Sequence, residues 1–265
     1  MYFSVLMSVY IKENSCYLDE CLNSLLNQTL QATEIVIVED GVITDSLIKV
    51  IEIYSKILPI KTVKLEKNEG LATALNAGLK KCSHELVLRM DADDISLPNR
   101  FERQIEFMLT HPEVSVSSAW IEERDQKMGG VKVLKRLPED HEKIVKFAKV
   151  RNPINHPVAI FRKSAVLSVG GYPIMYPEDY ALWSLMLVRG FRFANIQETL
   201  LNMRTGEDFI SRRGLNFLKK EVSLLKYLRA IGFFGLWDSL YYLSTRTFLR
   251  IAPPKIRGII YRLSR

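Results

Sequence analysis

Short apolar runs alternate with amphipathic segments along the first half of the chain. The runs predict strands at about 3–10, 34–38, 61–65 and 85–90. Between them, apolar side chains recur every three or four positions, which predicts helices at about 17–30, 44–56 and 70–81. Strands that are apolar throughout and alternate with helices are typical of a parallel sheet with both faces covered. The pattern therefore predicts an α/β fold with a Rossmann-like, mostly parallel sheet.

The second half of the chain is less regular. Its pattern predicts a helix at about 98–109, a strand at 114–119 and a helix at about 139–150. Turn-rich sequence continues to residue 177, where a further helix begins and runs to about 190. A boundary near 206–214 separates a folded body, residues 1–211, from a tail, residues 212–265, in which residues 217–228 have helical spacing.

The composition is that of a globular protein. The 265 residues are 48% hydrophobic and 25% charged, which excludes a disordered chain and a fibrous repeat. Cys16, Cys21 and Cys82 are odd in number and form no CxxC pair, so no disulfide framework or cysteine zinc site is expected. Cys16 and Cys21 are both expected in the core face of the first helix. Residues 1–10 have no basic n-region and predict a buried strand, not a signal peptide.

The basic charge of the chain lies in its tail. Residues 212–265 hold twelve Lys and Arg against Glu221 and Asp238, a net charge of +10, whereas the remaining 211 residues carry −3. A nucleic-acid-binding protein would more often carry its positive charge on the folded domain, so nucleic acid is not an expected partner. A basic tail rich in aromatic residues suits an anionic membrane surface. The alternative is a helical extension that packs on the body or on a second subunit.

No segment has the length and apolarity of a certain transmembrane helix. Residues 230–249 come nearest, but Asp238 and Arg246 interrupt them. The cysteine pattern indicates a reducing compartment, and the basic, aromatic tail favours a membrane surface. The expected location is the cytoplasm, with peripheral attachment to the inner face of the cell membrane.

Polar side chains stand at the ends of three predicted strands. Ser8 and Tyr10 end the first strand, and Glu39-Asp40 ends the second. Residues 91–94 (DADD) end the fourth. Ligands of open α/β sheets collect at the carboxyl ends of the strands. The sequence therefore predicts a binding site along this edge.

The DADD segment is the strongest single chemical signal. Closely spaced carboxylates repel one another and need a cation or hydrogen-bond donors to remain ionised. Oxygen ligands suit Mg²⁺ or Mn²⁺, which often complete their shell with substrate phosphates. The alternative is an acidic cap on the following helix.

Glu178-Asp179 forms a second acidic pair, at the predicted start of a helix. A carboxylate there is favoured by the helix dipole and is often structural. Near a metal-bound phosphate ester, the same carboxylate is a candidate general base for an incoming hydroxyl group.

Six segments in chain order resemble family 2 glycosyltransferases of the GT-A fold, of the kind that build bacterial polysaccharide, O-antigen or capsule. They are residues 4–10 (SVLMSVY), 39–41 (EDG), 68–78 (NEGLATALNAG), 89–94 (RMDADD), 98–104 (PNRFERQ) and 177–180 (PEDY). The resemblance covers about residues 3–211. It implies transfer of a sugar from a nucleotide diphosphate to an acceptor hydroxyl, with inversion at the anomeric carbon.

The resemblance also implies site residues. Those implied to bind the nucleotide-sugar are Ser8, Tyr10, Glu39, Asp40, Asn68, Gly70, Asp91, Arg100 and Arg204. Asp93, together with Asp91, is implied to hold Mn²⁺ or Mg²⁺ against the diphosphate leaving group. Asp179 matches the general base. Glu178 is its neighbour, with a role either on the acceptor side or in supporting the structure.

Further positions have an open alternative. His156 matches a histidine near the phosphates or acceptor, but a core or capping histidine fits equally. Arg204 and Arg212 resemble a flexible basic segment that closes over the diphosphate, or are solvated charges at the domain boundary. Arg100 could instead pair with Asp94 or Glu102, and Asn68 and Gly70 could simply cap a helix.

The expected donor is a UDP-hexose or a UDP-N-acetylhexosamine, with dTDP-rhamnose as an alternative. A membrane-attached tail would place the site beside a polyprenyl-diphosphate-linked glycan or a lipooligosaccharide acceptor. Two other readings compete with this one. A nucleotidyltransferase would carry a Gly-rich phosphate loop after the first strand, which is absent from residues 8–14. A non-catalytic, membrane-bound nucleotide-sugar-binding scaffold would not need both Asp93 and Asp179.

Overall fold

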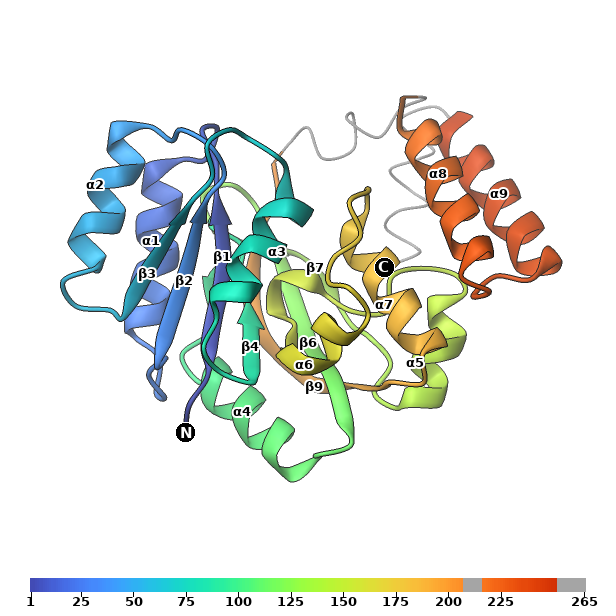
Figure 1. Cartoon of the computed structure of the whole chain (residues 1–265), viewed down its shortest axis with the longest axis horizontal. Coiled ribbons are helices and arrows are strands. Elements are labelled where there is room, and N and C mark those ends of the chain that lie inside the picture. The colour runs from blue at the N-terminus through green and yellow to red at the C-terminus, as the bar shows by residue number, and fades with distance from the viewer. Residues whose placement is uncertain (207–215, 252–265) are drawn as a thin grey trace.

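The computed structural model describes the backbone of residues 1–206 and 216–251 (Figure 1). Over these residues nine strands form one sheet in the order β3-β2-β1-β4-β8-β6-β9-β5, with β7 paired to β6. The strands are β1 (Ser4–Val9), β2 (Glu34–Glu39), β3 (Ile60–Lys64), β4 (Leu86–Arg89), β5 (Ile95–Ser96), β6 (Val114–Arg124), β7 (Val131–Lys135), β8 (Ile160–Arg162) and β9 (Arg192–Arg204).

Helices cover both faces of this sheet. They are α1 (Ser15–Leu26), α2 (Asp45–Tyr54), α3 (Leu71–Lys81), α4 (Arg100–Thr110), α5 (His141–Ala148), α6 (Lys163–Ser168), α7 (Glu178–Val188), α8 (Asn216–Ala230) and α9 (Leu236–Ile251), with a short 3₁₀ turn at His156–Val158. The predicted α/β fold is confirmed. Strands β1 to β4 are mutually parallel, as expected, and β8 joins them to β6 through antiparallel pairing.

Alternation along the central strands builds two layers of core. Val5, Met7 and Val9 of β1 face the cluster that includes α1, α2 and α4. Leu6 points the other way, into the cluster formed with α3, α6 and α7. At the second layer, an ideal Cβ on Gly78 of α3 would lie 2.5 Å from Leu6 Cδ1, so glycine allows this helix to lie directly on the sheet.

The sequence-based strand assignment was incomplete in the second half. Strand β6 runs five residues beyond its expected end at residue 119, and β9 was not predicted at all. The two strands pair in parallel along most of their length. The expectation for Cys16 was also wrong: Asn14 Oδ1 caps α1 by accepting from Cys16 N at 2.8 Å, and Cys16 is exposed whereas Cys21 is buried.

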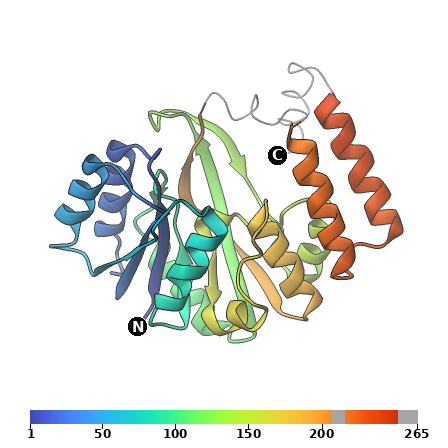
Figure 2. The same cartoon turned by 45° about the horizontal axis from the view of Figure 1, so that its top comes forward.

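The C-terminal helices α8 and α9 form a hairpin beside α7 and α5, seen as the orange and red pair in Figure 2. The hairpin packs on Ala148, Tyr180 and Ala181 of the body through five buried side chains: Leu224, Leu228, Phe233, Phe234 and Tyr242. Of the helices described here, none has both the length and the apolarity to cross a bilayer. The predicted boundary at residues 211 and 212 lies outside the described residues.

Candidate active site

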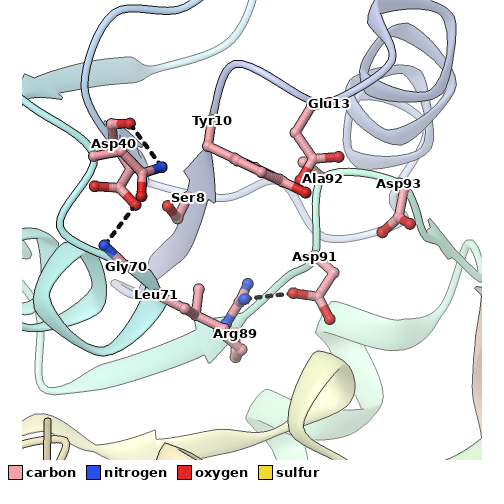
Figure 3. A pocket seen from close by; sticks show the side chains of 11 residues that line it. Ser8, Tyr10, Glu13, Asp40, Gly70, Leu71, Arg89, Asp91, Ala92 and Asp93 are labelled. Atoms are coloured by element: carbon pink, nitrogen blue, oxygen red, sulfur yellow. Dashed lines mark hydrogen bonds and ion pairs between the residues drawn. The ribbon is translucent and has the colours of Figure 1, made fainter. Parts of the chain in front are cut away.

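A cavity of about 250 Å³ opens where β1, β2 and β4 end (Figure 3). Its lining residues are Ser8, Tyr10, Glu13, Asp40, Asn68, Gly70, Leu71, Arg89, Asp91, Ala92 and Asp93. Seven of the predicted site residues are therefore brought together, from four separate segments. In Figure 3, Asp40 lies at one end of the cavity, and Glu13, Asp91 and Asp93 lie toward the other.

Asp40 joins the end of β2 to the start of α3. Its carboxylate accepts hydrogen bonds from the backbone N–H groups of Glu69 at 2.7 Å and Gly70 at 3.0 Å. Gly41 has φ +80°, and a Cβ there would lie 2.5 Å from Asn68 N. Only glycine lets the two loops approach so closely. Asp40 therefore holds this wall of the cavity while lining it.

Glu39 lies outside this cavity lining. Its side chain is buried beside β3 and pairs with Lys64 at 3.2 Å. Of the two acidic residues considered for nucleotide contact, the structure places Asp40 at the cavity and Glu39 in the sheet edge beside it.

The acidic end of the cavity holds more carboxylates than positively charged groups. Burial and the Asp91 carboxylate raise the pKa of Asp93 to about 6. Burial, with the charges of Asp93 and Asp91, raises the pKa of Glu13 to about 7. The buried Arg89 side chain pairs with Asp91 and also donates to the Met90 carbonyl. One arginine thus faces several carboxylates in this lining.

These carboxylates fit a hard divalent cation. Their oxygen atoms are the ligands that Mg²⁺ and Mn²⁺ prefer. Burial first, and then repulsion from neighbouring carboxylates, raises the pKa values of Asp93 and Glu13, and a bound cation would relieve that repulsion. Among the described residues, no three His, Cys, Asp or Glu side chains are arranged as a complete metal site. A cation held here would complete its shell with other oxygen atoms, such as those of water or of a bound phosphate.

Arg204 supports the acidic turn from behind. Its backbone N–H donates to Asp94 Oδ1 at 2.8 Å, and its Nε donates to the Asp93 carbonyl at 2.9 Å. Its guanidinium stacks 3.8 Å from the centre of the Tyr17 ring and pairs with Glu20. The side chain is almost fully buried. The expectation of a flexible arginine that closes over a diphosphate is thus corrected, because these contacts fix Arg204.

Arg100 is likewise part of the core. It is fully buried, and it donates to Gln104 Oε1 at 2.9 Å, Ser96 Oγ at 2.9 Å and the Arg89 carbonyl at 2.5 Å. The expectation that Arg100 contacts a nucleotide is corrected, since no part of it reaches the surface. Of the two predicted alternatives, Asp94 acts on Arg100 through its charge, without a hydrogen bond among those described, whereas Glu102 accepts from Thr29. Arg212 lies outside the described residues.

Asp179 and Glu178 form the first turn of α7. Asp179 is half-buried, and its carboxylate accepts from Asn152 Nδ2 at 2.5 Å and from Tyr180 N at 2.7 Å. Burial raises the pKa of Asp179. Burial and then Asp179 raise the pKa of Glu178 to about 7, and the charges of Arg89 and Asp91 also act on Glu178. The first turn of α7 therefore lies within electrostatic reach of the cavity.

His156 belongs to an aromatic cluster beside α7 and is not in the cavity lining. Its Nε2 lies 3.1 Å from the Tyr172 hydroxyl, and its ring contacts Trp183 edge-on. Burial, with a contribution from Arg89, places the pKa of His156 well below its ordinary value, so the ring is neutral at pH 7. The structure thus favours the core histidine over the ligand-binding one.

Sequence reasoning did not assign roles to Glu13, Arg89 and Asn152. Glu13 and Arg89 lie in the sequence within three positions of assigned residues at the ends of β1 and β4. Closeness to a strand end was the signal that could have identified them. Asn152 lies in an irregular segment, and only the fold brings it to Asp179.

Comparison with known proteins gives consistent results. The sequence profile described as "Glycosyl transferase family 2" matches residues 4–167. The amylovoran biosynthesis glycosyltransferase AmsE of Erwinia amylovora is 44% identical over 265 residues, covering 99% of both chains. The Escherichia coli UDP-Gal:alpha-D-GlcNAc-diphosphoundecaprenol beta-1,3-galactosyltransferase is 38% identical over 262 residues, covering 98% of this chain and 95% of the relative.

Solved structures share the fold. S. aureus TarS 1-349 matches with a TM-score of 0.67 at 21% identity, over 94% of this chain and 72% of the other. The mannosyltransferase PcManGT from Pyrobaculum calidifontis, in complex with GDP-Man and Mn²⁺, matches with a TM-score of 0.65 at 13% identity, over 99% and 79%. The expected GT-A fold is confirmed by this likeness.

Proposed function

Because this chain belongs to glycosyltransferase family 2, we propose that it transfers a hexose or N-acetylhexosamine from a UDP-sugar to a lipid-linked glycan of a surface polysaccharide. The observation that carries the proposal is the convergence of Asp40, Asp91 and Asp93 on one cavity with the first turn of α7 nearby. The Escherichia coli relative supports the substrate class, since its name specifies a UDP-galactose donor and a diphosphoundecaprenol-linked acceptor.

The cavity offers separate ends for the two parts of the donor. The end formed by Asp40, Asn68 and Gly70 would receive the nucleoside, together with Ser8 and Tyr10 from β1. The end with Asp91 and Asp93 would receive the diphosphate. Mn²⁺ or Mg²⁺ held there by Asp93 and Asp91 would neutralise charge that develops on the leaving group. Arg204 and Asp94 would hold the turn that carries both carboxylates.

Asp179 would accept the proton of the acceptor hydroxyl group. The hydroxyl oxygen attacks the anomeric carbon, the bond from that carbon to the diphosphate oxygen breaks, and UDP leaves from the opposite face. Asn152 and the Tyr180 N–H fix the Asp179 carboxylate, and the raised pKa of Asp179 makes it a better proton acceptor than a solvated aspartate. Glu178 would lie beside the reacting groups on the acceptor side.

A lipid-linked acceptor requires the enzyme to work at a membrane. We place it in the cytoplasm at the inner face of the cell membrane, attached peripherally through its C-terminal helices. The tail carries the basic charge of the chain, which favours an anionic leaflet.

A thermal-shift series tests the donor assignment. UDP, GDP, dTDP and their sugars are added with and without Mn²⁺ to the wild type, to Asp93→Ala and to Glu52→Ala, whose carboxylate is exposed on α2. A UDP-specific rise in melting temperature that needs Mn²⁺ and Asp93 is expected, because ligand binding stabilises the folded state by mass action. A dTDP-specific rise would replace the donor with dTDP-rhamnose.

Transfer is then measured by mass spectrometry. The acceptors are a synthetic sugar diphosphate with a long lipid and a matching acceptor with a short, water-soluble chain. A product one hexose or N-acetylhexosamine heavier supports the proposal. Donor binding without any product on these acceptors would contradict the acceptor class.

A further inference from the structure

Helix α9 exposes a row of large apolar side chains on one side. Leu236, Trp237, Leu240, Tyr241 and Leu243 are 60%, 81%, 50%, 53% and 40% exposed. We call these five residues the α9 face. Ser239 and Tyr242, which point the opposite way around the helix, are buried. Ser244 is exposed on the same side, so the side that the described residues leave uncovered is mainly, though not wholly, apolar.

The inner side of the hairpin is already satisfied by the body. Lys149 pairs with Asp238 at 3.1 Å, and its ammonium group lies 4.4 Å from the centre of the Phe233 ring. Arg246 donates to the Val150 carbonyl at 3.0 Å. These contacts fix α9 on the region that follows α5. None of the five α9-face residues belongs to the buried cluster that joins the hairpin to the body. Packing of the described part therefore does not account for their apolar composition.

We propose that the α9 face docks on an anionic lipid bilayer and enters one leaflet. Tryptophan and tyrosine favour the headgroup depth, and leucine favours the acyl boundary beneath it. This docking rests on the proposed function in one respect, because a lipid-linked acceptor gives the enzyme a reason to bind a membrane. In this arrangement the helix lies in the plane of the membrane interface, with its apolar side toward the acyl chains.

Basic residues on the neighbouring helix and in the sequence after α9 select the kind of membrane. Lys219, Lys226 and Arg229 are exposed on the partner helix α8. The sequence that follows α9, residues 252–265, contains four basic and no acidic residues. Basic residues close to an anionic surface strengthen binding of an interfacial helix. A bilayer that contains phosphatidylglycerol meets both the apolar and the charge requirement.

Docking through this face would fix the direction of the active site. Helix α9 packs on α8, and α8 packs on α7. The first turn of α7 carries Glu178 and Asp179. The stack of α9, α8 and α7 joins the membrane-bound face to Glu178 and Asp179. It would hold these two residues at one orientation to the bilayer. Membrane binding would then favour acceptors presented from the lipid surface.

Vesicle flotation tests the docking surface. The full chain is mixed with vesicles of phosphatidylethanolamine and phosphatidylglycerol, or of phosphatidylcholine alone. The test variant is Trp237→Ser with Tyr241→Ser. The matched control is Ile53→Ser with Ile57→Ser, two apolar side chains that are each 58% exposed in and just after α2. We expect the wild type and the control to float with the anionic vesicles, and the test variant to partition at least tenfold less. Equal flotation of all three proteins would overturn the proposal.

Tryptophan fluorescence reports which face enters the lipid. Of the three tryptophans, Trp183 is fully buried and Trp120 is half-buried, whereas Trp237 is 81% exposed, so a vesicle-induced blue shift is expected to come mainly from Trp237. Trp237→Phe keeps an apolar ring and is expected to float like the wild type while losing the shift and its quenching by brominated lipids. A shift that persists in Trp237→Phe would mean that another part of the chain enters the bilayer.

Two other occupants of the α9 face would give different results. A second copy of the chain would produce a dimer in light scattering that Trp237→Ser with Tyr241→Ser converts to a monomer, and vesicles would bind neither form. Residues 252–265 folded over the face would make truncation after Ile251 increase flotation, whereas docking with basic support makes the truncation decrease it. A dimer that does not bind vesicles, or flotation that increases on truncation, would overturn the membrane assignment.

The docking surface and the proposed function can fail separately. The test variant is expected to keep wild-type turnover on the water-soluble acceptor and to lose turnover only on the acceptor embedded in vesicles. Absence of transfer by the wild type on both acceptors would contradict the proposed function and leave the flotation result standing. Equal turnover of the wild type and the test variant on the embedded acceptor would remove the role of docking in acceptor presentation.

Discussion

At the level of single residues, the two carboxyl groups at the start of α7 differ in their environment, which suits them to the different roles proposed for them. Asp179 is held at both carboxylate oxygens by Asn152 and the Tyr180 N–H. Glu178 is more deeply buried, and its pKa of about 7 reflects burial first and then repulsion from Asp179. A fixed carboxylate is suited to take a proton in one direction, whereas a neutral Glu178 can donate a hydrogen bond to a sugar hydroxyl.

Asp179→Asn tests this division. The substitution keeps the size of the side chain and removes its basicity, so we expect turnover to fall by roughly 10²- to 10⁴-fold. The UDP-sugar-dependent thermal shift should be retained, because the donor cavity does not include Asp179. Glu178→Gln is the comparison and should reduce turnover less. If the two losses are exchanged, Glu178 is the base.

The acidic end of the donor cavity makes cation binding depend on pH. The pKa of Glu13 is about 7 and that of Asp93 about 6, so protons and a divalent cation compete for these carboxylates below those values. The apparent Kd for Mn²⁺ should rise by about tenfold per pH unit below pH 6 for each proton displaced. Calorimetry in two buffers of different ionisation enthalpy measures the protons released. Glu13→Gln should weaken the pH dependence near pH 7, and Glu52→Gln, on exposed α2, should leave it unchanged.

The residues of the cavity were easier to predict than those behind it. Ser8, Tyr10, Asp40, Asp91 and Asp93 follow strand ends, and the geometry of a parallel sheet alone brings such positions to one edge. Arg100 and Arg204 carry the same charge as a surface arginine. Arg204 is buried against Glu20, which lies 184 positions away, and no local pattern encodes that pairing. Arg100 bonds to near neighbours, Ser96 and Gln104, but its full burial depends on how α4 packs in the fold.

At the level of elements, β9 shows why the second half of the sheet escaped the sequence pattern. Its residues are a mixture of buried and half-buried positions, with Arg192 exposed at its start. The strand is specified by long parallel pairing with β6 and by a short antiparallel pairing with β5. Strands β1 and β2 were predicted because both of their faces are buried, which gives a continuous apolar run.

The junction between β2 and α3 depends on Gly41. Gly41→Ala would place a Cβ 2.5 Å from Asn68 N in a backbone conformation with φ +80°. We expect it to lower the free energy of unfolding by about 1–3 kcal/mol and to weaken UDP-sugar binding, because Asp40 and Gly70 would be displaced. Gly130→Ala is the control, since nothing lies within 4 Å of its Cβ and its φ is not in the left-handed range. Denaturant unfolding and the thermal shift measure both effects; an unaltered donor response in Gly41→Ala would argue against this junction as a wall of the site.

Glu34 at the start of β2 joins three segments at the other end of the sheet. It accepts from Ser4 Oγ at 2.6 Å, Ser83 N at 2.7 Å and Lys61 Nζ at 2.6 Å. Burial alone would raise its pKa, but hydrogen bonds from Lys61, Ser4 and Ser83 outweigh burial and lower the pKa of Glu34 to about 2. Because the folded state holds the ionised form more tightly than the unfolded state does, Glu34 stabilises the fold above pH 4.5. That contribution is lost as the pH falls from 4.5 to 2.

Glu34→Gln should therefore destabilise the protein at pH 7. The shift from 4.5 to about 2 corresponds to about 3 kcal/mol of unfolding free energy. Urea unfolding of the wild type and of Glu34→Gln between pH 7 and pH 3 should show two curves that converge as the pH falls. Glu66→Gln, an exposed carboxylate just after β3, is the comparison. A difference between wild type and Glu34→Gln that is independent of pH would mean that shape, not charge, explains the loss.

At the level of the whole molecule, the C-terminal hairpin is joined to the body by a shared core. Tyr180 and Ala181 of α7 and Ala148 of α5 are covered by hairpin side chains. The Tyr180 hydroxyl also donates to the Ala148 carbonyl beneath this layer. The charge pattern of the sequence suggested a body and a separable tail. Composition gives the charge and apolarity of the tail, but it does not show that hairpin side chains cover α7 and α5. A boundary at residues 211 and 212 stays a prediction.

Removal of residues 212–265 tests whether the tail is a dispensable membrane anchor or a part of the core of the body. A dispensable membrane anchor would leave the melting temperature of the body unchanged and abolish only vesicle binding. The shared core instead predicts exposure of Tyr180 and Ala181, and a loss of about 2–4 kcal/mol in the unfolding free energy of the body. Because α7 also carries Glu178 and Asp179, turnover on a water-soluble acceptor should fall along with stability. Trp237→Ser with Tyr241→Ser keeps the hairpin and should retain both the melting temperature and that turnover. If calorimetry and the transfer assay find the truncated body as stable and active as the full chain, the hairpin is an independent module, and docking could not orient the active site through α8 and α7.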